Sequence, residues 1–270
     1  MEQRCRALAH ELRTHPVGCR IEYHSSLDST NEVLRRRMAA EAVPTGQVVL
    51  SSHQTKGRGR RGRSFFSPPN QGLYLSVLLR PVCLPEQLSM LTAWAGVAAA
   101  EAVESAFGLS PEIKWPNDLV VRGKKLGGIL TELVLCPDTG TIDGVIVGIG
   151  INLTQAEADF GPELSPIATS LALEGVESPD PVVLTRSLLL ALDEMSAAFP
   201  AAHFSYHSRF TRRCLTLGQP VQVMASGSVR AGVAAALLPD FSLLVRWPDG
   251  TEEAVSTGEV SVRGLYGYTS

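Results

Sequence analysis

Eight consecutive residues, Lys56-Gly-Arg-Gly-Arg-Arg-Gly-Arg63, carry five cations and three glycines. No Asp or Glu occurs between Ala42 and Pro85, although the 270-residue chain has a formal net charge of -3. Glycine lets backbone N–H groups approach a ligand closely, and the planar guanidinium of arginine matches phosphate and carboxylate oxygens. This segment, called the glycine loop below, is therefore predicted to bind an anion.

Other patterns overlap with the glycine loop. Its glycines spell G-x-G-x-x-G, and it is one residue away from a P-loop, with Arg63 where lysine is required. Both patterns need a helix directly after the glycines, and Pro68 and Pro69 oppose one. An Arg-Gly arm for nucleic acid is a further alternative, but the loop follows a strand-like segment at residues 47–54 instead of a basic or disordered one. We favour a site for a small anionic ligand.

A second group of polar side chains surrounds Pro116. The proline keeps the residue before it extended, which leaves Asn117 and Asp118 in an irregular position beside a strand end. Such positions hold ligands more often than cores do. Two short strands with a turn at residues 122–123 are predicted here, and Lys125 begins the second strand.

Glycines also interrupt two predicted strands. Gly127 and Gly128 lie in one, and Gly148 and Gly150 alternate along another that ends at Asn152. Glycine inside a strand indicates a bulge or the close approach of another group. We expect the two strands to face each other across a flat slot.

The segment before the second predicted helix has two interpretations. Ser29 and Glu32 have the S-x-x-E spacing of a capping box, ahead of a helix that runs to about Ala42. The hydroxyl and amide groups of Ser29, Thr30 and Asn31 could also bind a neutral polar ligand. The spacing alone favours the helix cap.

These groups must be positioned by an α+β fold with a mixed or antiparallel sheet and flanking helices. Helices are predicted at residues 2–13, 29–42, 85–107, 181–199 and 202–213. Strands are predicted at residues 20–24, 47–54, 73–80, 112–121, 125–132 and 144–153. Beyond a boundary near residues 216–220, the pattern changes to five short strands, which predict a small β-barrel with turns at Ser226-Gly227, Pro239-Asp240 and Asp249-Gly250. These strands cover residues 221–224, 229–237, 242–247, 251–255 and 260–262.

His203 and His207 are one helical turn apart and could face one metal ion. Because no third ligand is nearby in the sequence, we favour a solvated helix face over a metal site.

Composition excludes broad classes of function. With 44% hydrophobic and 19% charged residues, the chain is typical of a globular protein. Its net charge opposes wholesale attraction to nucleic acid or anionic membranes, and the longest apolar run, residues 88–100, is too short to span a bilayer. Five scattered cysteines and an N-terminus without an apolar leader favour a reducing compartment, expected to be the cytoplasm.

Five blocks resemble the bacterial biotin–protein ligases. They are Ser29-Thr-Asn31, the glycine loop with Gln54 before it, Lys114-Trp-Pro-Asn-Asp118, Lys124-Lys-Leu-Gly-Gly-Ile129 and Gly148-Ile-Gly-Ile-Asn152. The resemblance covers about residues 20–265 and implies a class II synthetase-like catalytic domain at residues 1–215 and an SH3-like β-barrel at residues 216–270. It also looks like the monofunctional type, without the N-terminal DNA-binding domain. One departure is Phe65, where the family usually has a Trp with an indole N–H.

The resemblance implies that biotin and ATP condense to biotinyl-5′-AMP and that biotin then passes to a lysine of a biotin carboxyl carrier protein. Implied catalytic residues are Lys125, Arg58, Arg60 and Asp118, with Asp118 also a ligand of Mg²⁺. Implied biotin contacts are Ser29, Thr30, Asn31, Gln54, Gly57, Arg58, Gly59, Arg60, Lys125, Gly128 and Gly150. Implied ATP or adenylate contacts are Arg60, Arg61, Arg63, Phe65, Asn117, Lys125 and Asn152.

The carrier belongs to acetyl-CoA carboxylase or a related carboxylase, and no DNA or membrane partner is expected. A homodimer is a further implied assembly. The alternatives are a lipoate–protein ligase, a catalytically inactive biotin-binding protein and a nucleic-acid-binding module.

Overall fold

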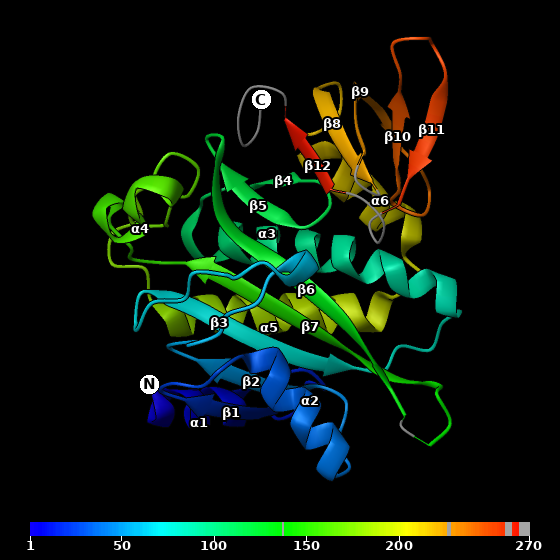
Figure 1. The fold of residues 1–270 in the computed structure, drawn as a ribbon. Helices are drawn as coiled ribbons and strands as arrows, with labels where there is room; N and C mark the ends of the chain where they lie inside the picture. The colour runs from blue at the N-terminus through cyan, green and yellow to red at the C-terminus, as the bar shows by residue number, and fades with distance from the viewer. Residues whose placement is uncertain (137, 226–227, 257–260, 265–270) are drawn as a thin grey trace.

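A seven-stranded mixed sheet forms the centre of the protein (Figure 1). The computed structural model describes residues 1–136, 138–225, 228–256 and 261–264. The sheet has the order β1-β2-β3-β7-β6-β5-β4; β1 and β2 are parallel, and every other neighbouring pair is antiparallel. The strands are β1 (Arg20–His24), β2 (Gln47–Ser51), β3 (Gly72–Leu79), β4 (Glu112–Lys114), β5 (Asp118–Val121), β6 (Lys124–Leu135) and β7 (Ile142–Asn152).

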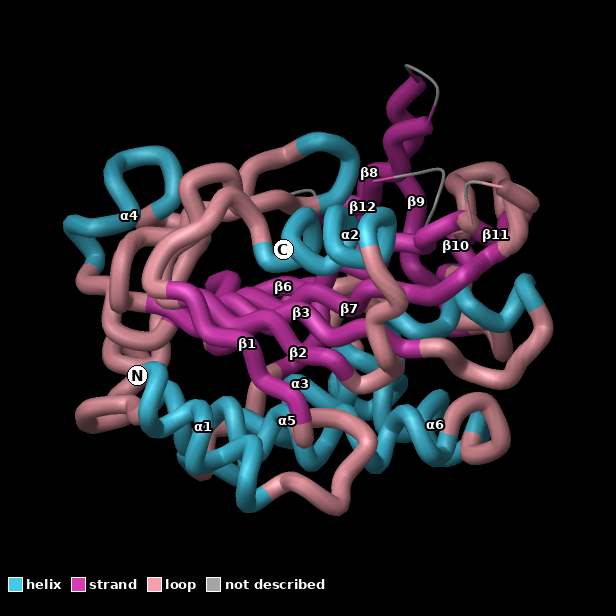
Figure 2. Tube along the Cα trace, turned by 90° about the horizontal axis from the view of Figure 1, so that it is seen from below, coloured by secondary structure: helices cyan, strands magenta, loops and turns pink. Residues whose placement is uncertain are grey.

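Helices cover the two faces of this sheet unequally (Figure 2). On one face lie α1 (Glu2–Glu11), α3 (Leu91–Phe107), α5 (Pro181–Ala198) and α6 (His203–Arg213). The opposite face carries α2 (Thr30–Ala40), which packs through Leu34 on Val49, Val134 and Ile146 of the sheet. Because that face is only partly covered by helix, it has room for a ligand.

Helix α3 is the most deeply buried helix of the core. Most of its buried residues are Leu, Ala and Val, which is typical of a helix in the protein core. Trp94 stacks on Tyr206 of α6 with ring centroids 3.8 Å apart. The predicted helix from Pro85 begins instead with a 3-10 segment, η2 (Pro85–Met90), and α4 (Glu157–Leu164) is a helix that no sequence pattern predicted.

The C-terminal strands form a five-stranded antiparallel sheet with the order β11-β10-β9-β8-β12. Its strands are β8 (Pro220–Ala225), β9 (Ser228–Leu237), β10 (Leu243–Arg246), β11 (Glu252–Val255) and β12 (Ser261–Gly264). Within the described ranges the outer strands β11 and β12 do not pair, so the predicted barrel is seen as a barrel-like sheet without closure. The predicted turn at Ser226-Gly227 and the strand start at Val260 lie outside the described residues.

The two sheets share a hydrophobic core, which contains Leu243 and Val245 beside the residues of α3. Trp115 connects them directly: its indole N–H donates to the Phe241 carbonyl at 2.8 Å, and its backbone N–H donates to Thr216 Oγ1 at 3.0 Å. The α+β prediction is thus confirmed. Among the helices described, none is long and apolar enough to cross a membrane.

Candidate functional site

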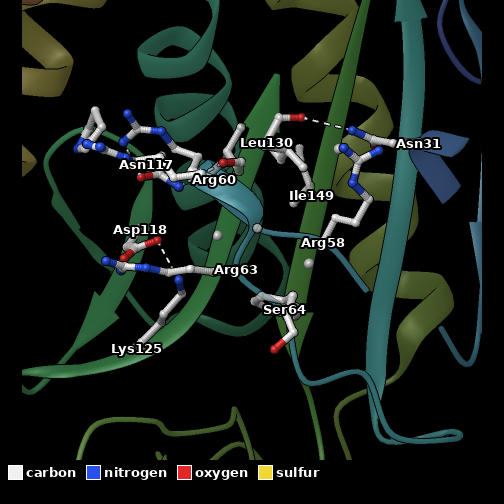
Figure 3. Close-up of a pocket in the computed structure, with 18 of the residues that line it drawn as sticks. Asn31, Arg58, Arg60, Arg63, Ser64, Asn117, Asp118, Lys125, Leu130 and Ile149 are labelled. Carbon is white, nitrogen blue, oxygen red and sulfur yellow. Dashed lines mark hydrogen bonds and ion pairs between the residues drawn. The ribbon is translucent and has the colours of Figure 1, made fainter. Parts of the chain in front are cut away.

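A cavity of about 500 Å³ opens on the sheet face that carries α2, a size typical of small-molecule sites (Figure 3). The glycine loop forms one wall, the start of α2 another, and β5, β6 and β7 the floor. The lining residues are Ser29, Thr30, Asn31, Gln54, Arg58, Gly59, Arg60, Arg61, Arg63, Ser64, Phe65, Lys114, Trp115, Pro116, Asn117, Asp118, Lys125, Gly128, Ile129, Leu130, Gly148, Ile149, Gly150 and Ile167.

An ion pair between Lys125 and Asp118 stands at the floor of the cavity. The Lys125 Nζ lies 2.7 Å from Asp118 Oδ1, with the two side chains 27% and 17% exposed. A bulge directly follows Lys125 in β6, because Val120 pairs with Lys125 while Leu119 pairs with Gly127. The extra residue in β6 re-aims the neighbouring side chains, and it confirms the bulge predicted at the glycines.

Backbone hydrogen bonds to residues 167 and 169 fix the main chain of Lys125. Its N–H donates to the Ile167 carbonyl at 2.8 Å, and its carbonyl accepts from the Thr169 N–H at 2.9 Å. Asn152 Nδ2 in turn donates to the Thr169 carbonyl at 2.9 Å. Lys125 is therefore held at a defined place on the floor by a segment that follows α4.

Arg60 brings a partly dehydrated cation into the cavity. Burial lowers the pKa of its guanidinium, and the nearby Asp118 carboxylate opposes this shift. Its Nη1 donates to Asn117 Oδ1 at 3.3 Å, and Asn117 Nδ2 donates to the Ile129 carbonyl at 2.9 Å. A cation that has already lost part of its water interacts strongly with an incoming anion.

The glycine loop folds as a tight reversal. The Gly59 N–H donates to the Arg63 carbonyl at 2.7 Å, around the 3-10 turn η1 (Arg60–Gly62). Arg61 adopts φ 58° within it, a left-handed conformation that few non-glycine residues adopt. The dinucleotide and P-loop patterns are excluded as predicted, because this short turn leads into an extended segment with Pro68 and not into a long helix.

The start of α2 presents polar groups to the cavity, and the predicted capping box is wrong. Ser29 is the N-cap residue, but its side chain makes no capping hydrogen bond. Glu32 instead pairs with Arg58 of the glycine loop. Gln54 Oε1 accepts from the Thr30 N–H at 2.9 Å and from Thr30 Oγ1 at 3.2 Å. Ser29, Thr30 and Asn31 all line the cavity, as in the alternative interpretation, although the Thr30 hydroxyl is already bound to Gln54 and Ser76.

The glycine strands are neighbours in one sheet, so the prediction that they face each other across a slot is wrong. Gly128 pairs directly with Gly150. A Cβ at Gly150 would lie 2.7 Å from the Phe65 ring, and one at Gly148 would lie 2.3 Å from Asn31 Oδ1. The missing side chains make room on the floor for groups that arrive from the loop and from α2.

Phe65 lies over this floor in place of the larger indole. Its ring makes an edge contact with Tyr74, with centroids 6.4 Å apart, and lies 5.8 Å from Lys125 Nζ. The ring therefore gives the cavity an apolar surface beside its cations.

Gly57 and Asn152 are the predicted contacts that the cavity lining leaves out. A Cβ at Gly57 would lie 2.3 Å from the Phe65 carbonyl, so this glycine permits the loop to pack. The Asn152 side chain is buried and binds Thr169 and Gln155, whose Nε2 donates to Asn152 Oδ1 at 3.1 Å. In this structure Asn152 supports the segment that holds Lys125 and does not face the cavity.

The two histidines of α6 lie away from this cavity, against Phe241, with centroids 5.8 Å and 5.3 Å from that ring. His207 Nε2 also lies 3.1 Å from the Leu238 carbonyl. They are partly buried, so the predicted solvated face is wrong. Within the described ranges, no group of three or more His, Cys, Asp or Glu side chains could hold a metal ion.

Sequence reasoning missed several lining residues because no motif marked their chemistry. Leu130, Ile149 and Ile167 contribute apolar surface. The strand periodicity placed the first two in the sheet, but only pairing decides which face they occupy. Ile167 belongs to an irregular segment without any periodic signal.

The mixed sheet with its asymmetric helical cover presents a cavity with a glycine-rich floor and a wall of cations, which suits a small anionic ligand with an apolar part. The family model of the biotin/lipoate A/B protein ligase family matches residues 23–152. The biotin–(acetyl-CoA-carboxylase) ligase of Mycobacterium tuberculosis is 34% identical over 236 residues, which cover 86% of this chain and 85% of that protein. The chain therefore belongs to the biotin/lipoate A/B protein ligase family.

Two further similarities agree with this assignment. The bifunctional ligase/repressor BirA of Bacillus subtilis is 38% identical over 183 residues, covering 68% of this chain and 55% of that protein. The chain thus spans about half the length of this relative. The biotin protein ligase from Aquifex aeolicus in complex with biotin and ATP has a TM-score of 0.76 and 29% identity, covering 91% of this chain and 99% of that one.

Proposed function

We propose that the protein is an ATP-dependent biotin–protein ligase. It joins the biotin carboxylate to the α-phosphate of ATP with release of pyrophosphate. The ε-amine of a carrier lysine then attacks the anhydride carbonyl, AMP leaves and the amine loses its proton. The observation that carries the proposal is the cavity, which combines the cations of the glycine loop with Lys125 and an apolar ring on a glycine floor.

The first step must bring a carboxylate up to an anionic triphosphate. Lys125 reaches the cavity from β6 and Arg60 from the glycine loop, and both cations lie near Asp118 (Figure 3), so each could neutralise one partner of this encounter. Their fixed positions would also orient the carboxylate towards phosphorus, which lowers the entropic part of the barrier. An anion would compete with Asp118 for Lys125, so ligand binding is expected to loosen that ion pair.

Biotin is expected at the α2 end of the cavity. Hydroxyls and an amide from Ser29, Thr30 and Gln54 suit the neutral ureido ring, which both donates and accepts hydrogen bonds. The apolar side chains of Leu130 and Ile149 suit its aliphatic part. The nucleotide would then lie towards Asn117, Phe65 and the later arginines of the loop.

Magnesium would enter the cavity as part of the substrate, MgATP. One Asp118 oxygen is already engaged by Lys125, and the described side chains form no metal cluster, so the protein alone does not fit a resident metal ion. Mg²⁺ commonly binds through one or two carboxylates together with substrate phosphates. A contact between Asp118 and phosphate-bound Mg²⁺ stays a prediction.

The decisive experiment measures pyrophosphate release from MgATP with biotin or lipoate as the acid. It is repeated with an apo biotin carboxyl carrier domain and a streptavidin blot. Biotin-dependent release with a labelled carrier would establish the ligase. Release with lipoate alone would assign the lipoate reaction, and tight biotin binding without release would indicate an inactive biotin-binding protein.

The carrier of acetyl-CoA carboxylase or a related carboxylase is the proposed acceptor, and the cytoplasm is the proposed compartment. The division into a catalytic part at residues 1–215 and an accessory part at residues 216–270 also stays a prediction. Light scattering tests the homodimer, and a mobility-shift assay tests the expected lack of DNA binding.

A further inference from the structure

Glu132 contacts two predicted biotin residues without lining the cavity itself. It lies in β6, and its side chain is 16% exposed. Its Oε2 accepts a hydrogen bond from Asn31 Nδ2 at 2.7 Å, and its Oε1 lies 3.3 Å from Arg58 Nη2. Figure 3 shows Asn31 and Arg58 next to each other at one side of the cavity. One carboxylate thus holds both side chains, each through a separate oxygen.

The carboxylate is the shorter of two contacts that orient the Asn31 amide. Because an ionised carboxylate only accepts hydrogen bonds, the Nδ2 end of the amide must face Glu132. The Oδ1 end then faces Ser76, a fully buried residue of β3 whose Oγ lies 2.5 Å away. Gly148 leaves the space that Oδ1 occupies. The orientation of Asn31 therefore depends on Ser76 at one end and, at the other, on Glu132 together with the Leu130 carbonyl, which accepts from Nδ2 at 3.4 Å.

The Arg58 guanidinium is bound by two carboxylates at the base of the glycine loop. Glu32 of α2 pairs with Arg58 and lies 3.5 Å from Arg35, and Arg35 Nη2 lies 3.0 Å from Glu132 Oε1. Two guanidinium groups and two carboxylates thus form a neutral cluster, in which Glu132 is the most buried side chain and Arg58 the most exposed, at 16% and 44%. This cluster fixes the first arginine of the loop to α2 and β6.

We propose that Glu132 is a positioning residue for biotin binding, which acts by fixing the Asn31 amide and the Arg58 guanidinium together. The inference rests on the proposed function, since it takes biotin as the ligand. Glutamine at this position cannot replace the carboxylate. If its oxygen accepts from Asn31, its NH₂ group faces the donors of Arg58; if it is turned, two amide donors face each other.

The test compares the KM for biotin, the KM for ATP and kcat in pyrophosphate release for three variants. Glu132→Gln should raise the KM for biotin about tenfold, the effect of losing one charge-assisted contact. Glu32→Gln should raise it less, because Arg58 keeps its contact with Glu132 and the Asn31 amide stays bound. Glu22→Gln is the matched control: it removes a carboxylate of β1 that pairs with Arg37 outside the cavity, and it should leave all three values unchanged. The KM for ATP should change less than about twofold.

A double-mutant comparison separates positioning from a general loss of structure. In an Arg58→Gln background, Glu132→Gln should raise the KM for biotin by a smaller factor, because one of its two contacts is already absent. An unchanged KM for biotin in Glu132→Gln, or an equal rise for biotin and ATP, would overturn the inference. If Glu132→Gln fails to fold, Glu32→Gln tests the fixing of the Arg58 guanidinium by the same comparison of the KM for biotin with the KM for ATP. Wild-type protein without biotin-dependent pyrophosphate release would refute the proposed function instead.

Discussion

Lys125 is a cation whose position on the cavity floor is fixed by several contacts. It is a half-buried cation in contact with one carboxylate, and backbone hydrogen bonds hold both its N–H and its carbonyl. Removing such a charge from a preorganised site typically lowers the rate about 10²- to 10³-fold. We expect Lys125→Ala to lower biotin-dependent pyrophosphate release by that factor.

The neighbouring lysine provides a matched control for that prediction. Lys124 Nζ donates to the Ser165 carbonyl at 3.2 Å, outside the cavity lining. Lys124→Ala should therefore retain nearly normal release. Equal losses in both variants would mean that a general effect on β6, and not the charge of Lys125, is responsible.

The glycine floor gives a second prediction at the residue scale. In Gly150→Ala the new methyl group would lie 2.7 Å from the Phe65 ring, so the ring or the strand must shift. We expect weaker biotin and ATP binding and a loss of about 1–3 kcal/mol in the free energy of unfolding, from overpacking. Calorimetric titration and urea unfolding measure the two effects.

Gly96 of α3 serves as the control for this substitution. A Cβ there would meet Ile113 at the ordinary distance of 3.7 Å, and alanine favours a helix by about 0.5–1 kcal/mol. Gly96→Ala should therefore fold at least as stably as the wild type and bind both ligands normally. Normal binding by Gly150→Ala would show that the floor tolerates a side chain.

At the scale of the element, Asp28 fixes the start of α2. Its carboxylate accepts the Ser29 N–H at 2.8 Å and forms a two-point contact with Arg36, at 2.5 and 3.0 Å. The Arg36 contact is the main reason why the pKa of Asp28 is lowered to about 2. A carboxyl with a lower pKa in the folded state stabilises the protein above its unfolded pKa of about 3.9, and this contribution is lost as the pH falls towards 2.

Asp28→Asn should therefore be less stable than the wild type at pH 6, by about 0.5–1 kcal/mol for this largely exposed pair. The difference should narrow between pH 4 and about 2, as the wild-type carboxyl becomes protonated. Urea midpoints for both proteins across this range measure the effect. A stability difference that does not change with pH would mean that the charge of Asp28 is not responsible for it.

At the scale of the whole molecule, Trp115 couples the cavity to the C-terminal sheet. Trp115 is one of the residues that line the cavity, and its indole N–H donates to the Phe241 carbonyl, in a core shared by both sheets. Trp115→Phe leaves that buried carbonyl without its donor, which costs about 1–3 kcal/mol. We expect a lower urea midpoint and a single unfolding transition monitored by probes in both sheets.

Trp94 provides the control for the Trp115→Phe substitution. It is also fully buried, but its Nε1 has no hydrogen-bond partner among the described residues. Trp94→Phe should therefore cost less than Trp115→Phe, because it removes packing without breaking a hydrogen bond. Two separate transitions in the wild type would mean that the sheets unfold independently, in agreement with the predicted division near residue 216.

The sequence by itself determined the local features of this protein. The glycines and arginines of the loop and the turn at residues 122–123 are properties of neighbouring residues, and the structure keeps them, whereas the segment predicted to be extended before Pro116 is a turn at residues 115–117. The strand and helix order followed from periodicity in the same way. Most of the residues that the motifs predicted as contacts line one cavity, and their role in binding stays a prediction.

Tertiary structure alone decided which distant groups meet. Glu32 looked like a helix cap because its spacing is local, yet it pairs with Arg58, a residue 26 positions away. Asn152 looked like a ligand contact, yet the segment after α4 covers it. Strand pairing made the glycines neighbours, and it brought Glu132 to Asn31. Such contacts depend on register and on the face to which each side chain points, and no short stretch of sequence encodes either.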